Sequence, residues 1–301
     1  MYVDGVTKVT LMSGITETEN GAYAFLTNMT QISIPSTTIY HQGGTFTMSD
    51  LTSISLPSGT KKLSEYAPDP SKVKAFGMFD QCESLSQVTL PNTLEEIGDW
   101  AFDGCTSLES VEIPSSVANI GGGAFCGCTS LGSIVIPEGV TNIVAAAFRD
   151  CTSLGSIVIP EGVTKIGNSA FWGCKALKNV NIPSSVANID NYAFSGCTSL
   201  ESVEISEGVT NIGEYAFETC KSLKSIVIPE SVTNIGNCAF FYCTSLESVT
   251  IKATTLQKMP GGDTFKQCYK LKTIYVPTAS VGDYQKVTGW GWSGFEIVGI
   301  G

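Results

Sequence analysis

Apolar residues recur along this chain in one short pattern that repeats almost from end to end. The segment 131–151 reads LGSIVIPEGVTNIVAAAFRDC, and the segment 154–174 reads LGSIVIPEGVTKIGNSAFWGC. A phenylalanine recurs every 23 residues from Phe79 to Phe240, and a cysteine and a pair of β-branched or leucine residues keep the same step. A fixed period of about 20 to 50 residues is typical of a solenoid, in which each unit buries its apolar face only by stacking on its neighbours.

Each unit predicts two short extended segments followed by a tight turn. In L-x-x-I-x-I-P, β-branched residues alternate with polar ones, which favours a strand, and the proline ends it because proline has no N–H to donate. A second apolar pair follows, such as Val140 and Ile143. The closing A-F-x-x-C is too short for more than a helical turn or two.

The complete unit, L-x-x-I-x-I-P-x-x-V-x-x-I-G-x-x-A-F-x-x-C, resembles the BspA-type leucine-rich repeat of bacterial and protist surface proteins. The likeness covers nearly the whole chain, with local departures such as Ser206 and Lys252 in place of the proline. The resemblance implies a β-rich solenoid of the α/β leucine-rich-repeat type, right-handed and curved, with short helical turns. Counting strand cores from Val9 to Ile274 predicts about 12 rungs.

The regularity of the repeat divides the chain into three parts of one continuous solenoid domain. Terminal repeats are expected to be atypical because an open end of the core must be covered. The parts are atypical repeats over 1–78 with an inserted loop near 58–77, regular repeats over 79–251, and a last irregular repeat with a cap over 252–301.

The cap follows the segment 274–277, which we expect to be the last strand. The segment 281–287 could form a short helix that closes the core. Trp290, Trp292 and Phe295 would then cover the open end. A platform on which sugars stack is an alternative use of these aromatic side chains.

Composition excludes several classes of partner. The formal net charge of −11 argues against binding to nucleic acid and to anionic membrane surfaces, since both need clustered Lys or Arg side chains on the protein. No apolar run is long enough to span a bilayer. The first residues, MYVDGVTKVT, lack the basic start and apolar core of a signal peptide, so if the protein is exported, we expect its signal to lie outside this sequence.

Most of the eleven cysteines occupy one position of the repeat. Equivalent side chains in stacked rungs point the same way, which is unsuited to disulfide geometry, so buried free thiols are predicted. Cys126 and Cys238 lie off this position and are expected near the surface. The nine cysteines of the repeat position are Cys82, Cys105, Cys128, Cys151, Cys174, Cys197, Cys220, Cys243 and Cys268.

Catalytic chemistry finds no support in the sequence. His41 is the single histidine, and the repeats supply no nucleophile and orienting group to go with it. Glu112 and Glu204 share a column of the solenoid but are four rungs apart, about 19 Å at strand spacing, which is too far for them to act on one bond. No metal-ligand cluster or phosphate loop is present, so we predict a non-enzyme without metal or cofactor.

Three sets of residues are candidates for contact with a partner. The outward strand positions are small and rich in hydroxyl groups, an inserted loop would gather lysines, and aromatic residues cluster around the A-F turn. The loop could equally be a tolerated insertion, and the aromatic residues could cover neighbouring turns. The candidates are Glu112, Asn181, Glu204 and Tyr275 on the strands, Lys61, Lys62, Tyr66, Lys72 and Lys74 in the loop, and Trp172, Tyr192 and Tyr215 at the turns.

The resemblance to BspA-type proteins implies a secreted or surface-attached protein that adheres to host proteins or other cells. An extracellular protein is therefore the expected partner, bound by a monomer. A carbohydrate-binding module and an inert spacer that presents other domains are the alternatives left open.

Overall fold

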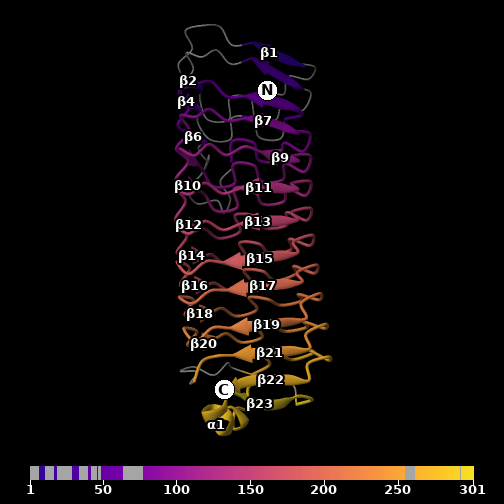
Figure 1. Cartoon of the computed structure of the whole chain (residues 1–301). Coiled ribbons are helices and arrows are strands. Elements are labelled where there is room, and N and C mark those ends of the chain that lie inside the picture. Colours follow the sequence, from indigo (N-terminus) through magenta and orange to yellow (C-terminus); the bar gives the residue numbers. More distant parts are fainter. Residues whose placement is uncertain are drawn as a thin grey trace, which may run out of the picture. The chain divides into compact units, whose positions relative to one another are not determined.

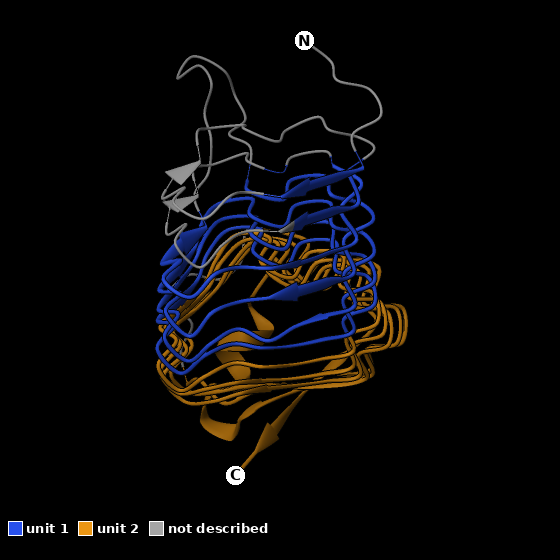
Figure 2. Ribbon diagram, turned by 90° about the horizontal axis from the view of Figure 1, so that it is seen from above, with its two compact units in different colours: residues 1–154 blue, residues 155–301 orange. Residues whose placement is uncertain are grey.

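The computed structural model describes residues 7–10, 17–18, 29–33, 40–41, 46, 49–63, 77–254, 262–291 and 293–301. The chain divides into two compact units at residue 154 (Figure 2), and Figure 1 labels their strands and helix. Unit 1 covers Met1–Leu154 and unit 2 covers Gly155–Gly301. Each unit is a stack of parallel strands, and Tyr66, Lys72, Lys74 and Trp292 lie outside the described residues.

Each turn of unit 1 has a first strand of two or three residues and a two-residue second strand. The first strands are β1 (Lys8–Thr10), β3 (Gln31–Ser33), β5 (Ser53–Ser55), β7 (Gln87–Thr89), β9 (Ser110–Val111) and β11 (Ser133–Val135). The second strands are β2 (Glu17–Thr18), β4 (Tyr40–His41), β6 (Lys62–Leu63), β8 (Glu96–Ile97), β10 (Asn119–Ile120) and β12 (Asn142–Ile143).

Unit 2 repeats the arrangement and adds the helical elements. Its first strands are β13 (Ser156–Val158), β15 (Asn179–Ile182), β17 (Ser202–Ile205), β19 (Ser225–Ile228), β21 (Ser248–Ile251), β22 (Thr273–Pro277) and β23 (Glu296–Ile300). Its second strands are β14 (Lys165–Ile166), β16 (Asn188–Ile189), β18 (Asn211–Ile212) and β20 (Asn234–Ile235). The 3₁₀ helix η1 (Thr278–Ser280) runs directly into α1 (Val281–Gln285).

The structure confirms a β-solenoid with little helix and corrects the number of rungs. All twelve expected strand cores are strands, from β1 to β22. Within the described residues, however, only ten turns contain both strands, because no second strand follows β21 or β22 there. The segment 274–277 is also not the last strand, since β23 continues the sheet in parallel beside β22. No repeat signal marks β23 in the sequence, because its EIVGI lacks the leucine and proline of the unit.

Stacked phenylalanine rings form the centre of each unit. In unit 1 the ring centroids of Phe79 and Phe102 are 5.2 Å apart, with planes inclined by 14°. In unit 2 Phe194 lies 5.2 Å from Phe171 and 5.4 Å from Phe217. These rings are fully buried. The fixed step of the sequence therefore becomes a continuous aromatic column within each unit.

The A-F-x-x-C segment forms tight turns rather than the expected helical turns. Left-handed backbone occurs twice in each turn from the one around Phe102 to the one around Phe265, for example at Tyr215 (φ 56°) and at Thr219 (φ 60°). This conformation directs alternate N–H groups toward the next turn, so the N–H of Tyr192 donates to the carbonyl of Glu214 and that of Phe194 to the carbonyl of Ala216. Successive turns are thereby hydrogen-bonded to one another as the strands are.

All eleven cysteines are free, as the sequence predicted. All nine thiols of the repeat position are buried, and at least eight of them donate to a phenylalanine carbonyl of the preceding turn, as in Cys105 Sγ to Phe79 O at 3.2 Å. Cys126 is half-buried, but Cys238 is only 6% exposed, so its expected place near the surface is wrong. The Cys238 thiol forms a hydrogen bond with the Tyr215 side chain.

The C-terminal cap extends the aromatic column of unit 2. The ring of Trp290 stacks on that of Phe265, with centroids 5.5 Å apart. The ring of Tyr284, in α1, lies nearly parallel to that of Trp290, with centroids 6.4 Å apart. The Tyr284 hydroxyl donates to the Ala253 carbonyl at 2.7 Å, and burial raises the pKa of this tyrosine to about 12. Gly291, with φ 69°, permits the sharp turn here because a Cβ atom would lie 2.3 Å from the Asp263 Cα. The expected helix is present, and Trp290 is a buried part of the core.

Candidate interaction surfaces

The outward side chains of the first strands form a surface that we call the strand face. In unit 1 two shallow hollows lie along it, of about 390 and 290 Å³. Gln87 and Thr89 line both hollows, with Ser53 and Ser55 in the first and Ser110 and Glu112 in the second. Thr89 and Ser110 carry the small hydroxyl side chains that the sequence predicted for these columns, whereas the hollows themselves were not predicted.

On unit 2 the strand face brings two candidate residues together. Asn181 and Glu204 are paired in register on β15 and β17, and both are exposed. Neither side chain makes a hydrogen bond or ion pair within the described part of the chain. Tyr275 stands further along the same column, half-buried beside Thr250. Val158 and Val227, with exposed fractions of 70% and 45%, complete a smooth surface with few aromatic groups.

Of the four lysines expected in an inserted loop, the structure describes Lys61 and Lys62, whereas Lys72 and Lys74 lie outside the described residues. Lys62 begins β6, so Lys61 and Lys62 belong to a regular turn rather than to a loop. Each forms an ion pair of 2.8 Å with the next turn, Lys61 with Glu95 and Lys62 with Glu96. Their charges are therefore largely balanced, although exposed pairs of this kind contribute only about 0.2–1 kcal/mol. Sequence reasoning missed the pairing because the partners are separated by the irregular step.

The side chains around A-F-x-x-C form a second surface, the turn face. In unit 2, Tyr192 and Tyr215 stack with ring centroids 4.9 Å apart and planes inclined by 2°. A hydrogen bond with the Cys238 thiol raises the pKa of Tyr215 to about 12. Trp172 is half-buried and lies in another column of the repeat, two positions beyond that of the alanine. The aromatic residues thus cover neighbouring turns and one another, which leaves only part of each ring for a partner.

Within the described residues, side chains that could bind a metal ion or act as nucleophiles do not cluster into a site. No group of three His, Cys, Asp or Glu side chains there is placed to hold a metal ion. Cys126 contacts Asp103, and burial together with that carboxylate raises the pKa of its thiol to about 12, so it is a poor nucleophile at neutral pH. Among the same residues, no helix has the length and apolar character needed to cross a bilayer.

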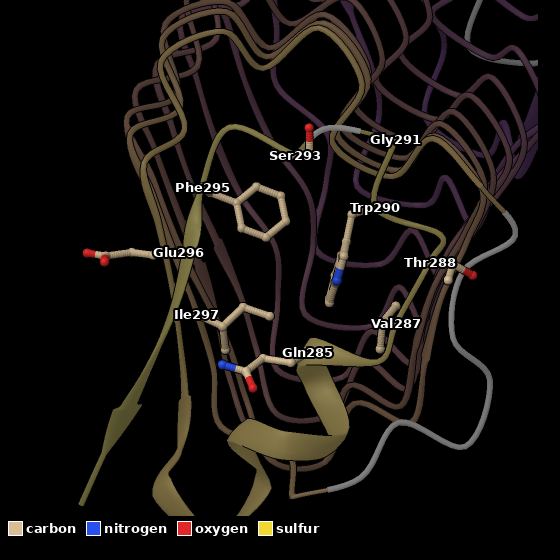
Figure 3. A pocket seen from close by; sticks show the side chains of 9 residues that line it. All are labelled: Gln285, Val287, Thr288, Trp290, Gly291, Ser293, Phe295, Glu296 and Ile297. Atoms are coloured by element: carbon tan, nitrogen blue, oxygen red, sulfur yellow. The ribbon is translucent and has the colours of Figure 1, made fainter.

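A larger hollow at the C-terminal end of unit 2 was not foreseen (Figure 3). Its volume is about 680 Å³, and it lies beside β23 and the end of α1. Trp290, Phe295 and Ile297 point into it, whereas the Glu296 carboxylate points away. The sequence indicated the aromatic residues, but it could not show that they leave a space between them.

Comparison with known protein families identifies the repeats of this chain. A family model described as "BspA type Leucine rich repeat region (6 copies)" matches residues 2–74, 75–200 and 164–285. The chain belongs to the BspA-type leucine-rich-repeat family. A search of the curated proteins found no match.

Solved structures of bacterial leucine-rich-repeat proteins resemble this BspA-type chain. A leucine-rich repeat protein from Bacteroides ovatus is 26% identical with a TM-score of 0.64, covering 98% of this chain and 84% of that one. A leucine rich cell surface protein from Faecalibacterium prausnitzii is 27% identical with a TM-score of 0.59, covering 96% and 77%. The pneumococcal vaccine antigen PcpA shares the fold, at 18% identity and a TM-score of 0.61 over 98% and 79% of the two chains.

Proposed function

We propose that this BspA-type protein is a non-enzymatic scaffold, secreted or held at the cell surface, that mediates adhesion by binding an extracellular protein. Its family and its likeness to a Faecalibacterium cell surface protein support this location. Leucine-rich-repeat scaffolds offer extended surfaces suited to macromolecular partners.

The observation that carries the proposal is that the strand face of unit 2 keeps polar groups that the fold does not use. Asn181 and Glu204 are exposed and uncommitted. On the side of the second strands, by contrast, Lys165 pairs with Asp190 at 2.8 Å and the Asn234 amide donates to Asn211. Polar groups available at fixed spacing on a rigid strand surface can form specific hydrogen bonds with a partner without reorganisation.

Binding to a panel of purified extracellular-matrix proteins tests the proposal. A strand-face variant, Asn181→Ala with Glu204→Ala, is expected to weaken binding of a hit by about tenfold or more. A turn-face variant, Tyr192→Ala with Tyr215→Ala, and a third variant, Lys61→Ser with Lys62→Ser, should stay within about twofold. Circular dichroism and thermal unfolding verify that each variant is folded.

Two outcomes would overturn the proposal. Binding only to a glycan array, lost in the turn-face variant, would make the chain a carbohydrate-binding module. Absence of binding to every protein and glycan would favour a spacer. Antibody labelling of intact and permeabilised cells tests the location, since labelling only after permeabilisation contradicts a surface role.

A further inference from the structure

The last strand of unit 2 ends the sheet with an open edge. β23 pairs with β22 over five register positions, from Thr273 with Glu296 to Pro277 with Ile300. Within the described residues it has no other strand partner. Its sequence, EIVGI, carries neither lysine nor proline, the residues that commonly protect exposed edges. The edge is therefore available for pairing.

The hollow beside β23 lies where the core of another rung would begin. Inward residues of successive strands form a column from Val249 through Ile274 to Ile297. Ile297 remains half-exposed, although Val249 and Ile274 are fully buried. Together with Phe295, Ile297 forms an apolar wall of the hollow (Figure 3). A further strand in the same register would place its inward side chain in this space.

Trp290, which lines the hollow, also has a buried donor without a partner among the described residues. Trp290 is 5% exposed, and its Nε1 atom is buried with no hydrogen-bond acceptor in the described part of the chain. A buried N–H group without an acceptor is unfavourable, and a carbonyl oxygen that reached it from the hollow would relieve that cost. An extended peptide offers a carbonyl oxygen at every residue.

The helix α1 limits what can fit at this end. It packs beside β23 and borders the hollow on one side (Figure 3). A complete turn of another solenoid needs room for a second strand and a turn segment as well, whereas a single extended segment needs only the edge and the hollow. The Glu296 carboxylate, exposed on the outward side, favours a basic residue opposite it on such a segment.

We propose that β23 binds an extended peptide segment of a partner protein by strand addition, with an aliphatic side chain of the peptide in the hollow and a Lys or Arg opposite Glu296. Main-chain hydrogen bonds would supply affinity, and the hollow and the carboxylate would supply selectivity. This site lies apart from the Asn181 and Glu204 surface and does not depend on the function proposed for it.

A synthetic peptide derived from the β22 sequence tests the proposal with the intact chain. The probe is acetyl-Thr-Lys-Ile-Tyr-Val-Thr-amide, with lysine opposite Glu296 and isoleucine opposite Ile297. Control peptides replace the lysine with aspartate or the isoleucine with serine. We expect the probe to bind, to protect the amides of β23 from hydrogen exchange, and to shift the Trp290 indole signal in ¹⁵N NMR. Both control peptides should bind more weakly.

A charge reversal separates strand addition from non-specific binding. Glu296→Lys should weaken binding of the lysine peptide by up to about fivefold and strengthen binding of the aspartate peptide, because an exposed ion pair contributes little. Glu201→Lys, a matched charge reversal at an exposed residue of another turn, should affect neither peptide.

Three results would overturn the proposal. The first is no binding of the probe at a concentration of about 1 mM, since a dissociation constant above this value is weak even for a short peptide. The second is equal binding of the probe and the serine control peptide. The third is that the probe does not protect the β23 amides from hydrogen exchange. A concentration-dependent dimer that Glu296→Lys abolishes would instead assign the edge to a second copy of the chain.

Discussion

At the scale of single residues, the turns depend on backbone conformations that L-amino acids disfavour. Two columns of the repeat are left-handed, and one of them holds glycine at Gly104, Gly127, Gly173 and Gly196. Asp150 and Thr219 occupy equivalent positions with φ of 57° and 60°. The left-handed region costs an L-residue roughly 1–2 kcal/mol, and a β-branched side chain is especially unfavourable there. The stacked hydrogen bonds between turns impose this conformation regardless of the side chain.

Replacing Thr219 by glycine should therefore stabilise the protein. Glycine removes the cost of left-handed backbone, but its larger conformational freedom in the unfolded chain destabilises the folded state by roughly 0.5–1 kcal/mol. Because the first effect is the larger one, we expect the free energy of unfolding to rise by about 1 kcal/mol. Urea unfolding of the purified variant measures it. Thr210→Gly is the matched control: its hydroxyl donates to the Ala187 carbonyl at 3.1 Å and its backbone is not left-handed, so a loss of about 1 kcal/mol is expected. Equal losses in both variants would show that the turn carries no strain.

At the scale of the element, the unit of stability is the turn stacked between two neighbours. The strands are only two to five residues long, and none could persist alone. Phenylalanine rings tie each turn to the next across 5.2 to 5.6 Å within each unit. Offset-stacked aromatic pairs contribute about 0.5–1.5 kcal/mol beyond the burial of their surface. The fixed step of the phenylalanines in the sequence accounts for this column, because only a ring in the same place in every turn can produce it.

Loss of one ring from the column should destabilise unit 2 severely. Phe194→Ala removes a fully buried side chain with stacking partners on both faces, so a cost of about 3–5 kcal/mol is expected. Tyr192→Ala, two residues away on the half-exposed turn face, should cost about 1 kcal/mol. Denaturant unfolding compares the two. Similar losses in both variants would contradict a dominant contribution of the inner column to stability.

At the scale of the whole molecule, the buried thiols act together because they repeat in turn after turn. Burial raises the pKa of Cys105, Cys128, Cys197, Cys220 and Cys243. Their side chains remain protonated and act as small apolar groups that donate to carbonyl oxygens. In an unfolded chain the same thiols would ionise near pH ~8.5.

Stability should consequently fall with rising pH in the alkaline range. Below pH ~8.5 the thiols are protonated in both the folded and the unfolded protein, so their full contribution to the free energy of unfolding is present. Above this pH the unfolded protein loses thiol protons that the folded protein keeps, so the free energy of unfolding decreases as the pH rises. Well above pH ~8.5, each thiol approaches a slope of about 1.4 kcal/mol per pH unit, or about 7 for these five, because the unfolded state has then lost the proton that the folded state keeps. Urea unfolding from about pH 8 to 10 measures the slope. In the triple variant Cys105→Ala, Cys197→Ala, Cys243→Ala the slope should be shallower by about 4 kcal/mol per pH unit, and an unchanged slope would refute the role of the thiols.

The sequence by itself determined the repeat, the parallel strands, the phenylalanine column and the free thiols, because each follows from identical residues at a fixed step. It also placed Asn181 and Glu204 together, since equal positions in neighbouring repeats must lie side by side. Three features were decided only by the tertiary structure. The left-handed turns arise from hydrogen bonds between turns. The pairing of Lys61 and Lys62 depends on register across an irregular step. The strand β23 and its hollow exist because the end of the core must be covered by whatever segment can reach it, and no periodic signal encodes that fit.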